Sequence, residues 1–206
     1  MNFLSHIYLS GNNNLIKIGN LVADGIHGKS YLNYPEAMQI GILHHREIDT
    51  FTDAHPLFRQ CTKRLHYKYS HYSGIVIDIY FDHFLAKNWS QYHDLPLEIF
   101  VNDFYEMIQK HEEILPEKFR RLLPFMVAQN WLLSYASIEG IQEVFNGMHR
   151  RTKQQAALNE AVTELKLYYK AFEADFKLFF EDLKVFSQIK LNELISNYQL
   201  KSNFGL

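Results

Sequence analysis

The chain has 206 residues, 47% of them hydrophobic, and a formal net charge of −2. This length fits a single domain with a sizeable core, and the small net charge argues against bulk nucleic-acid binding as the main task. The single Cys61 cannot form an internal disulfide, and no apolar run approaches the roughly 20 residues of a membrane span, so we expect a soluble cytoplasmic protein without membrane insertion.

Most segments follow a helical period, and four prolines precede helix-like runs, as expected for a proline in a first helical turn. These are Pro35, Pro56, Pro96 and Pro116. The pattern predicts helices over roughly 3–10, 15–27, 35–51, 55–69, 72–87, 96–112, 117–135, 138–148 and 153–197. Pro124 should kink or split the seventh helix, and the last should break near Ser187. Because no segment alternates like a strand, the predicted fold is a compact all-α bundle forming one domain over 1–206.

Histidine and aspartate concentrate in the first part of the chain. Five of the nine aspartates and eight of the eleven histidines fall within residues 1–83, often between apolar neighbours. A carboxylate on a buried surface is costly unless it is paired, hydrogen-bonded or bound to a metal. The sequence therefore predicts a His/Asp metal site.

Two predicted helices carry these residues at helical spacing. His45 and Asp49 are four residues apart and share one face, and Asp78 and Asp82 do the same on another helix. His83 lies about 100° around the helix from Asp82. That second helix can therefore offer a metal ligand and a neighbouring acid or base.

Two further segments contribute Asp24, one turn after Asn20, and His6 near the start of the chain. Imidazole together with carboxylate suits Mn²⁺, Fe²⁺, Zn²⁺ or Mg²⁺. The lack of usable cysteines disfavours a thiolate zinc site, and an oxygen-rich ligand set favours Mn²⁺ or Mg²⁺. Such an ion lowers the pKa of bound water and neutralises charge on a phosphoryl oxygen.

Each motif also has a purely structural interpretation. Asp78 and Asp82 could form structural ion pairs with an arginine, and Arg46 and Arg150 are the candidate partners. Arg46 could equally bind phosphate or orient a carboxylate, and the sequence does not decide between these roles. His44 could be helix filler beside its neighbour. It is the joint presence of the motifs that favours a site.

Three basic clusters lie outside this constellation. They are Lys63-Arg64 with Lys68, Lys118 with Arg120-Arg121, and Arg150-Arg151 with Lys153. Each is a solvated helix surface by default, or else a docking face for an acidic partner or a phosphate. Arg150 and Arg151 are the most suggestive, because they closely follow Asn146-Gly-Met, a predicted helix end with Gly147 as terminator.

Taken together, these residues resemble the acyl carrier protein phosphodiesterases, also called holo-acyl-carrier-protein hydrolases. The matching segments are Asn2-Phe-Leu-x-His6, Gly19-Asn-Leu-x-Ala-Asp24, Gly41-Ile-x-x-His45-Arg-x-Ile-Asp49-x-x-Thr-Asp53, Asp78-x-x-x-Asp82-His83-Phe-Leu, Trp89, Trp131 and Asn146-Gly-Met. They run in order to about residue 151. We therefore take 1–151 as the family-matching catalytic core and 152–206 as a helical C-terminal extension.

The resemblance implies a helical fold related to the HD-domain metal phosphohydrolases, a divalent metal with Mn²⁺ favoured, and a cytoplasmic location. It also implies hydrolysis of the phosphodiester that joins 4′-phosphopantetheine to a serine of holo-acyl carrier protein. The family pattern places its histidine at His45, so His44 is not carried over. The HD signature reads His-Asp, whereas this chain reads Asp82-His83, so analogy with ordinary HD enzymes does not assign the ligands.

The resulting hypothesis divides the site residues into three groups. The expected metal ligands are His6, Asp24, His45 and Asp82. The expected catalytic residues are His83, Arg46, Asp49 and Asp78. The expected substrate-binding residues are Asn20, Arg150, Arg151 and Lys153. In this hypothesis His83 is the acid that protonates the serine oxygen, and Arg46 or Arg150 steadies the phosphate. Asp49 or Asp78 is a further metal ligand or the partner of a ligand. The basic residues guide the docking of an acidic carrier protein.

Two other functions stay open at this point. The same metal core would serve an HD-type phosphohydrolase acting on a nucleotide or another small phosphoester. A small closed pocket would favour such a small substrate, whereas a broad basic rim would favour the carrier protein as substrate. The chain could also be a non-catalytic helical module that carries metal or haem. A ferritin-like di-iron bundle would need Glu-x-x-His pairs, which this sequence lacks.

Overall fold

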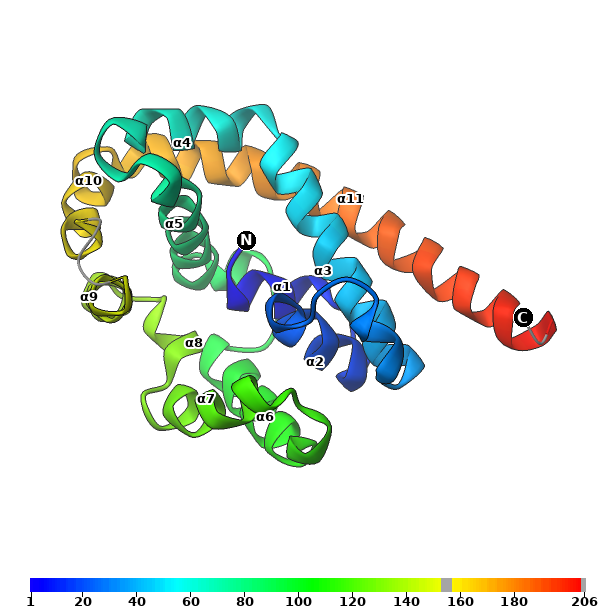
Figure 1. Cartoon of the computed structure of the whole chain (residues 1–206). Coiled ribbons are helices and arrows are strands. Elements are labelled where there is room, and N and C mark those ends of the chain that lie inside the picture. Colours follow the sequence, from blue (N-terminus) through cyan, green and yellow to red (C-terminus); the bar gives the residue numbers. More distant parts are fainter. Residues whose placement is uncertain (153–156, 205–206) are drawn as a thin grey trace.

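The computed structural model describes residues 1–152 and 157–204, and every regular element in this part of the chain is a helix (Figure 1). The α-helices are α1 (Phe3–Leu9), α2 (Asn14–Val22), α3 (Glu36–Ala54), α4 (Pro56–Tyr69), α5 (Ser73–Lys87), α6 (Leu97–Gln109), α7 (Glu117–Ala128), α8 (Trp131–Ser134), α9 (Ile138–Arg151), α10 (Ala161–Leu167) and α11 (Tyr169–Phe204). Short 3₁₀ turns are η1 (Ala23–Gly25), η2 (Ser30–Asn33), η3 (Ser70–Tyr72), η4 (Trp89–Gln91), η5 (Glu112–Ile114) and η6 (Leu158–Glu160). The prediction of a compact all-α fold is confirmed.

The predicted helix over 117–135 is split, but not at its proline. Pro124 lies inside α7, where it removes one backbone hydrogen bond without ending the helix. The break comes at Asn130, which has the left-handed dihedrals φ 46° and ψ 54°. Asparagine tolerates this conformation better than most residues do. The chain therefore reverses there and starts the short helix α8.

The C-terminal half corrects two further predictions. Gly147 does not terminate a helix, because α9 continues through it to Arg151. The last predicted helix breaks at Tyr168, between α10 and α11, and not near Ser187. Ser187 instead lies buried inside α11, where its hydroxyl and its carbonyl face His44 Nε2 at 2.9 and 3.1 Å.

Helix α5 is the centre of the fold, because residues on nearly all of its sides are buried. Its aromatic residue Phe81 contacts Phe58 of α4 and both Phe176 and Phe179 of α11. Burying such aromatic side chains is a large favourable term in folding. The polar residues of α5 are consequently enclosed by protein.

Helices α2 and α3 cross closely because glycines face each other's backbone. A Cβ atom at Gly19 would lie 2.2 Å from the carbonyl oxygen of Met38, and one at Gly41 would lie 2.1 Å from that of Ile16. Any side chain at either position would push the helices apart. This close crossing brings the backbone of α2 within hydrogen-bonding distance of side chains on α3.

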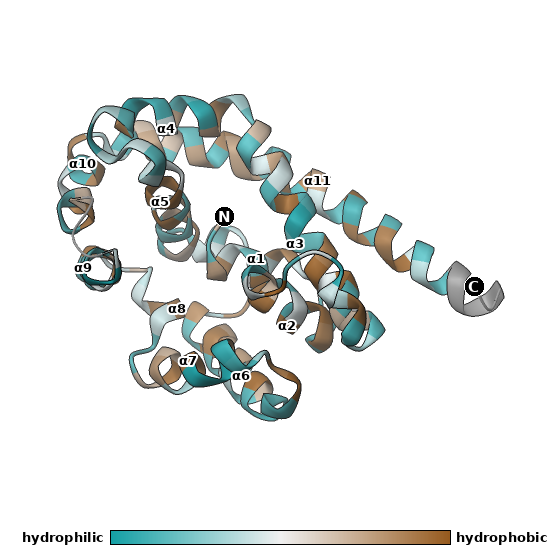
Figure 2. Ribbon diagram, viewed as in Figure 1, coloured by the Kyte–Doolittle hydropathy of each residue, from teal (hydrophilic) through white to brown (hydrophobic). Residues whose placement is uncertain are grey.

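Helix α11 runs along α4, crosses α3 and projects beyond the rest of the fold (Figure 1). Beyond the main core it buries Leu191 against Ile16 of α2 and Ile40 of α3. Its surface alternates hydrophobic and hydrophilic residues (Figure 2). Among the described residues, no helix combines the length and apolarity needed to cross a membrane.

Candidate active site

Three residues from two helices form a compact cluster of metal-ligand type. The rings of His6 (α1) and His45 (α3) are stacked, with centroids 4.0 Å apart. His45 Nε2 lies 2.9 Å from Asp49 Oδ2, and His6 Nε2 lies 3.2 Å from Asp49 Oδ1. One ligand atom from each residue lies within 4.8 Å of the other two. The cluster thus presents two imidazole nitrogens and a carboxylate to one small volume.

Asn20 orients both rings. Its side-chain oxygen lies 2.7 Å from His6 Nδ1, and its backbone oxygen lies 2.8 Å from His45 Nδ1. Because both oxygens are acceptors, each Nδ1 carries a proton, and each Nε2 is the ring nitrogen that faces the carboxylates. Asn20 is fully buried. It therefore positions the two histidines, which corrects the expectation that it binds substrate.

Two further carboxylates border the cluster. Asp24 Oδ1, at the 3₁₀ turn η1, lies 3.2 Å from His45 Nε2. Asp78 Oδ1, on α5, lies 3.1 Å from the amino nitrogen of Met1, which is also 3.5 Å from Asp49 Oδ1. The structure therefore gathers three aspartates and two histidines, although only Asp49 contacts both rings.

The electrostatics of the cluster favour a bound cation. Burial lowers the pKa of His6 to about 4, so this ring is neutral. Burial also acts to lower the pKa of His45, but hydrogen bonds to Asp24 and Asp49 outweigh it and raise that pKa to about 9. Burial acts to raise the pKa of Asp49, and the neighbouring His45 and His6 nevertheless hold it well below its usual range. In the protein alone, a proton on His45 therefore supplies the positive charge.

The donor set fits a divalent transition-metal ion. His6 Nε2 is buried and has no hydrogen-bond partner among the described residues, since its approach to Asp49 lacks hydrogen-bond alignment. An unpartnered neutral imidazole nitrogen beside a second imidazole and an ionised carboxylate is typical of Mn²⁺, Fe²⁺ or Zn²⁺ sites. Asn20 provides the outer hydrogen bonds that such histidine ligands require.

Asp82, expected as a metal ligand, lies elsewhere. Its carboxylate accepts hydrogen bonds from the backbone N–H of Leu4 at 2.8 Å and of Ser5 at 3.2 Å, and from the Ser5 hydroxyl. These are free N–H groups at the start of α1. Burial raises the pKa of Asp82 to about 6, against the effect of these bonds. Asp82 therefore secures the helix that carries His6, and Asp49 takes the central place in the cluster.

The expected acid, His83, is also placed away from the cluster. Its Nδ1 lies 2.7 Å from the carbonyl oxygen of Tyr135, and its Nε2 lies 2.8 Å from the hydroxyl of Tyr169. The side chain is buried. Because both ring nitrogens hold the fold together, the expectation that His83 donates a proton to the substrate is corrected.

Arg46 likewise has a structural role. Its guanidinium donates a hydrogen bond of 2.9 Å to the carbonyl oxygen of Ile26 and lies over the ring of Tyr31, 5.3 Å from its centroid. These contacts secure the segment that follows η1, where Asp24 is located. One Arg46 donor is therefore used by the backbone, and the expectation that Arg46 steadies a phosphate stays a prediction.

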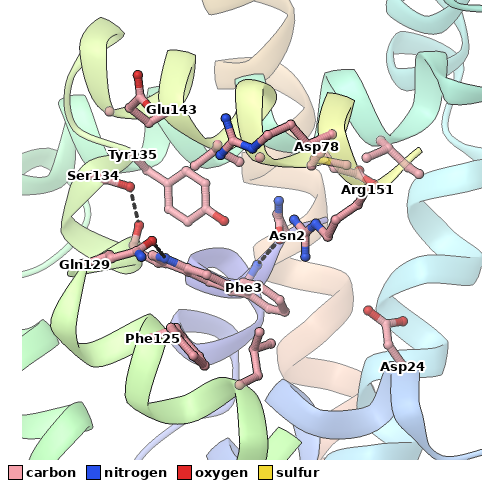
Figure 3. Close-up of a pocket in the computed structure, with 18 of the residues that line it drawn as sticks. Asn2, Phe3, Asp24, Asp78, Phe125, Gln129, Ser134, Tyr135, Glu143 and Arg151 are labelled. Atoms are coloured by element: carbon pink, nitrogen blue, oxygen red, sulfur yellow. Dashed lines mark hydrogen bonds between the residues drawn. The ribbon is translucent and has the colours of Figure 1, made fainter. Parts of the chain in front are cut away.

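A cleft of about 1070 Å³ opens beside the cluster (Figure 3). Asp24 and Asp78 lie on its wall, as do Arg150 and Arg151 from α9. Most of the remaining wall is apolar or aromatic: Phe3, Ile75, Leu122, Phe125, Trp131, Tyr135, Val144 and Met148. Apart from Phe3, Trp131 and Met148, which belong to the quoted motifs, none of these was singled out from the sequence, because such side chains give the same signal as ordinary core. Lys153, expected to bind substrate with the arginines, lies outside the described residues.

The three basic clusters differ in their pairing. Arg64 lies 3.5 Å from Asp175, and Lys68 lies 2.8 Å from Glu160. Arg121 pairs with Glu117, and Arg120 donates to the carbonyl oxygens of Glu113 and Leu115. Arg150 and Arg151 are exposed and have no carboxylate partner in the described part of the chain. Their charge is therefore available to a ligand.

Comparison with known proteins gives a consistent result. The family model described as acyl carrier protein phosphodiesterase matches residues 1–183, past the last motif quoted from the sequence. A protein of that name from Photorhabdus laumondii is 35% identical over 183 residues, covering 87% of this chain and 91% of the relative. Its namesakes from Pectobacterium atrosepticum and Salmonella agona are 30% and 32% identical, each covering 87% of this chain and 94% of the relative. No solved structure gives a significant match.

Proposed function

The chain belongs to the acyl carrier protein phosphodiesterase family, a family of hydrolases, and on this premise we propose that it releases 4′-phosphopantetheine from holo-acyl carrier protein. Water cleaves the phosphodiester to a serine of the carrier, and the products are apo-carrier and 4′-phosphopantetheine. The observation that carries the proposal is the His6–His45–Asp49 cluster, because the carboxylates that border it, Asp24 and Asp78, line an open cleft. We also propose that the fold is related to that of the HD-domain metal phosphohydrolases and that the protein is cytoplasmic.

We propose further that His6, His45 and Asp49 hold a divalent ion, with Mn²⁺ preferred, and that Asp24 supports it. When bound, the ion would neutralise charge on the phosphoryl oxygens and increase the acidity of water. The protein's own contribution is orientation. Asn20 fixes both rings so that each Nε2 faces the ion's position, and Asp24 and Asp49 provide the negative charge that retains a cation.

The shape and polarity of the cleft support a carrier-borne substrate over a nucleotide. The cleft is not a small closed pocket, since Phe125 on its wall remains 59% exposed. The apolar and aromatic part of its wall suits an uncharged pantetheine arm. The arm can extend along the wall while the protein to which it is attached stays outside.

Docking of the carrier is assigned to Arg150, together with Lys153 as expected from the sequence. Acyl carrier proteins are acidic, and an unpaired positive charge at the rim accelerates encounter with an acidic surface. The Arg150 guanidinium lies near Gly147 on α9, since a Cβ atom there would be 3.9 Å from Arg150 Nη2. Because this attraction acts between exposed charges, added salt should weaken the binding of the carrier by screening them.

Mass spectrometry of the carrier tests this proposal. Purified protein with Mn²⁺ should convert holo-carrier to apo-carrier, and a chelator should stop the conversion until Mn²⁺ is restored. Cyclic and linear nucleotides, offered at the same concentration, should be poor substrates. Unchanged holo-carrier together with rapid nucleotide hydrolysis would contradict the proposal and favour the small-phosphoester alternative.

A further inference from the structure

We infer that Tyr135 is a substrate-contacting residue whose hydroxyl donates a hydrogen bond to a phosphoester oxygen in the cleft. The inference rests on the proposed function, because that function supplies the phosphoester. Tyr135 follows α8 directly, and its side chain lines the cleft (Figure 3). The side chain is only 2% exposed.

The hydroxyl of Tyr135 lacks the partner that a buried tyrosine normally has. Among the described residues no hydrogen-bond partner meets it, and its oxygen is open to the cleft and not sealed in the core. Other buried tyrosines are satisfied: the hydroxyl of Tyr69 bonds Glu164, and that of Tyr80 bonds a backbone carbonyl. A hydroxyl that opens on a cleft and has no protein partner is free to donate its hydrogen bond to a ligand.

The backbone around Tyr135 is held firmly. His83 Nδ1 lies 2.7 Å from its carbonyl oxygen. Helix α9 packs tightly against the preceding residue, since a Cβ atom at Gly140 would lie 2.0 Å from the carbonyl oxygen of Ser134. The ring therefore has a fixed direction into the cleft (Figure 3). A preorganised donor of this kind can hold an anionic group without reorganising.

The neighbouring groups identify the ligand as an anion. The Asn2 side-chain oxygen accepts a 2.8 Å hydrogen bond from the backbone N–H of Phe3, which leaves its NH₂ group as a donor. Arg151 extends from α9 toward the same part of the cleft, and its charge acts on the Tyr135 hydroxyl (Figure 3). The pKa of that hydroxyl is raised well above its usual value by burial, so it stays protonated. The Tyr135 hydroxyl, the Asn2 NH₂ group and the Arg151 guanidinium are donors of the kind that bind phosphate oxygens.

Calorimetric binding of 4′-phosphopantetheine to the full-length protein tests the inference. Tyr135→Phe should raise the Kd about tenfold, as expected for one lost hydrogen bond to a charged group, with little change in thermal stability because no internal bond is lost. Tyr80→Phe is the matched control: it should lower thermal stability, by losing a buried hydrogen bond, and leave the Kd unchanged. Unphosphorylated pantetheine should bind both variants and the wild type alike.

Two results would overturn the inference. An unchanged Kd for 4′-phosphopantetheine in Tyr135→Phe would mean that the hydroxyl does not contact the ligand. An equal loss for pantetheine would place the contact on the arm and not on the phosphate. The proposed function fails separately: a wild-type protein that binds 4′-phosphopantetheine but leaves holo-carrier intact would refute the reaction while the Tyr135 subsite stands.

Discussion

Helices α3 and α5 both carry histidine and aspartate side chains, yet they use them differently. On α3, His45 faces Asp49 and stacks on His6, so titratable side chains contact one another. On α5, both oxygens of Asp82 and both nitrogens of His83 face backbone groups or hydroxyls. A buried histidine or aspartate becomes reactive only when its partners leave a lone pair or a charge free for a ligand.

The first way to break this comparison is Asp49→Asn. Turnover of holo-carrier should fall about 10³-fold or more, because the change removes the only carboxylate that contacts both rings. The rise in unfolding temperature caused by Mn²⁺ in the wild type should also disappear. Asp103→Asn, at an exposed position on α6, is the control and should match the wild type. Full turnover by Asp49→Asn would show that Asp49 of α3 is not part of the catalytic centre.

Asp82→Ala should have the opposite effect to Asp49→Asn, with a large loss of stability and a small loss of turnover. It leaves two backbone N–H groups of α1 and the Ser5 hydroxyl unsatisfied, so the free energy of unfolding should fall by about 1–3 kcal/mol. Turnover per folded molecule should fall less than about tenfold, and Mn²⁺ should still stabilise the variant. Chemical denaturation with and without Mn²⁺ measures both effects. If Mn²⁺ no longer stabilised the variant, Asp82 would be a metal ligand after all.

Arg150→Glu separates docking from chemistry. We expect KM for holo-carrier to rise about tenfold, since a rim charge that attracts an acidic partner is reversed. Hydrolysis of bis(p-nitrophenyl) phosphate, which has no carrier to dock, should change little. The exposed Lys118→Glu on α7 is the matched charge reversal. Equal losses on both substrates would mean that Arg150 acts on the phosphate itself.

The neighbours His44 and His45 should make the metal-free protein most stable near pH 6.5. Burial lowers the pKa of His44 to about 4, so stability falls as pH drops from about 6.5 toward 4, where the unfolded chain takes up a proton and the native ring does not. The pKa of His45 is raised to about 9, so its stabilisation is complete below about 6.5 and is lost as pH rises to about 9. Unfolding temperatures across this range, without metal, measure both slopes.

Two changes to this titration, one substitution and one added ion, test the contribution of His45. In His45→Gln the decline above about pH 6.5 should become shallower, because the proton that His45 takes up on folding is gone. With Mn²⁺ present, the wild type should also lose this decline, since the ion replaces the proton. A stability that keeps rising from pH 6.5 to 9 in the metal-free wild type would contradict the assigned direction of the His45 pKa.

The helices were predictable because their signals are local. Apolar periodicity and the prolines at the starts of α3, α4, α6 and α7 locate most of the fold. The break at Asn130 was not predictable, because its left-handed turn depends on how α8 packs. Local patterns therefore gave helix identity, whereas the reversals between helices were set by tertiary contacts.

The site was predictable in part for the same reason. Residue type and spacing pointed to His6, Asp24 and His45, which the structure brings together around Asp49. They could not show that Asp82 faces backbone N–H groups 78 and 77 residues away in the chain. They also gave no sign of the unsatisfied hydroxyl of a single tyrosine among many aromatics.

The most direct test of the account is to locate the ion. Crystals grown with Mn²⁺ should give an anomalous-scattering peak between His6 Nε2, His45 Nε2 and the Asp49 carboxylate, at roughly 2.0–2.3 Å from each ligand atom. The same crystals of Asp49→Asn should lack the peak. A peak beside Asp82 or His83, or none in the wild type at saturating Mn²⁺, would contradict the assignment of the centre to α1 and α3.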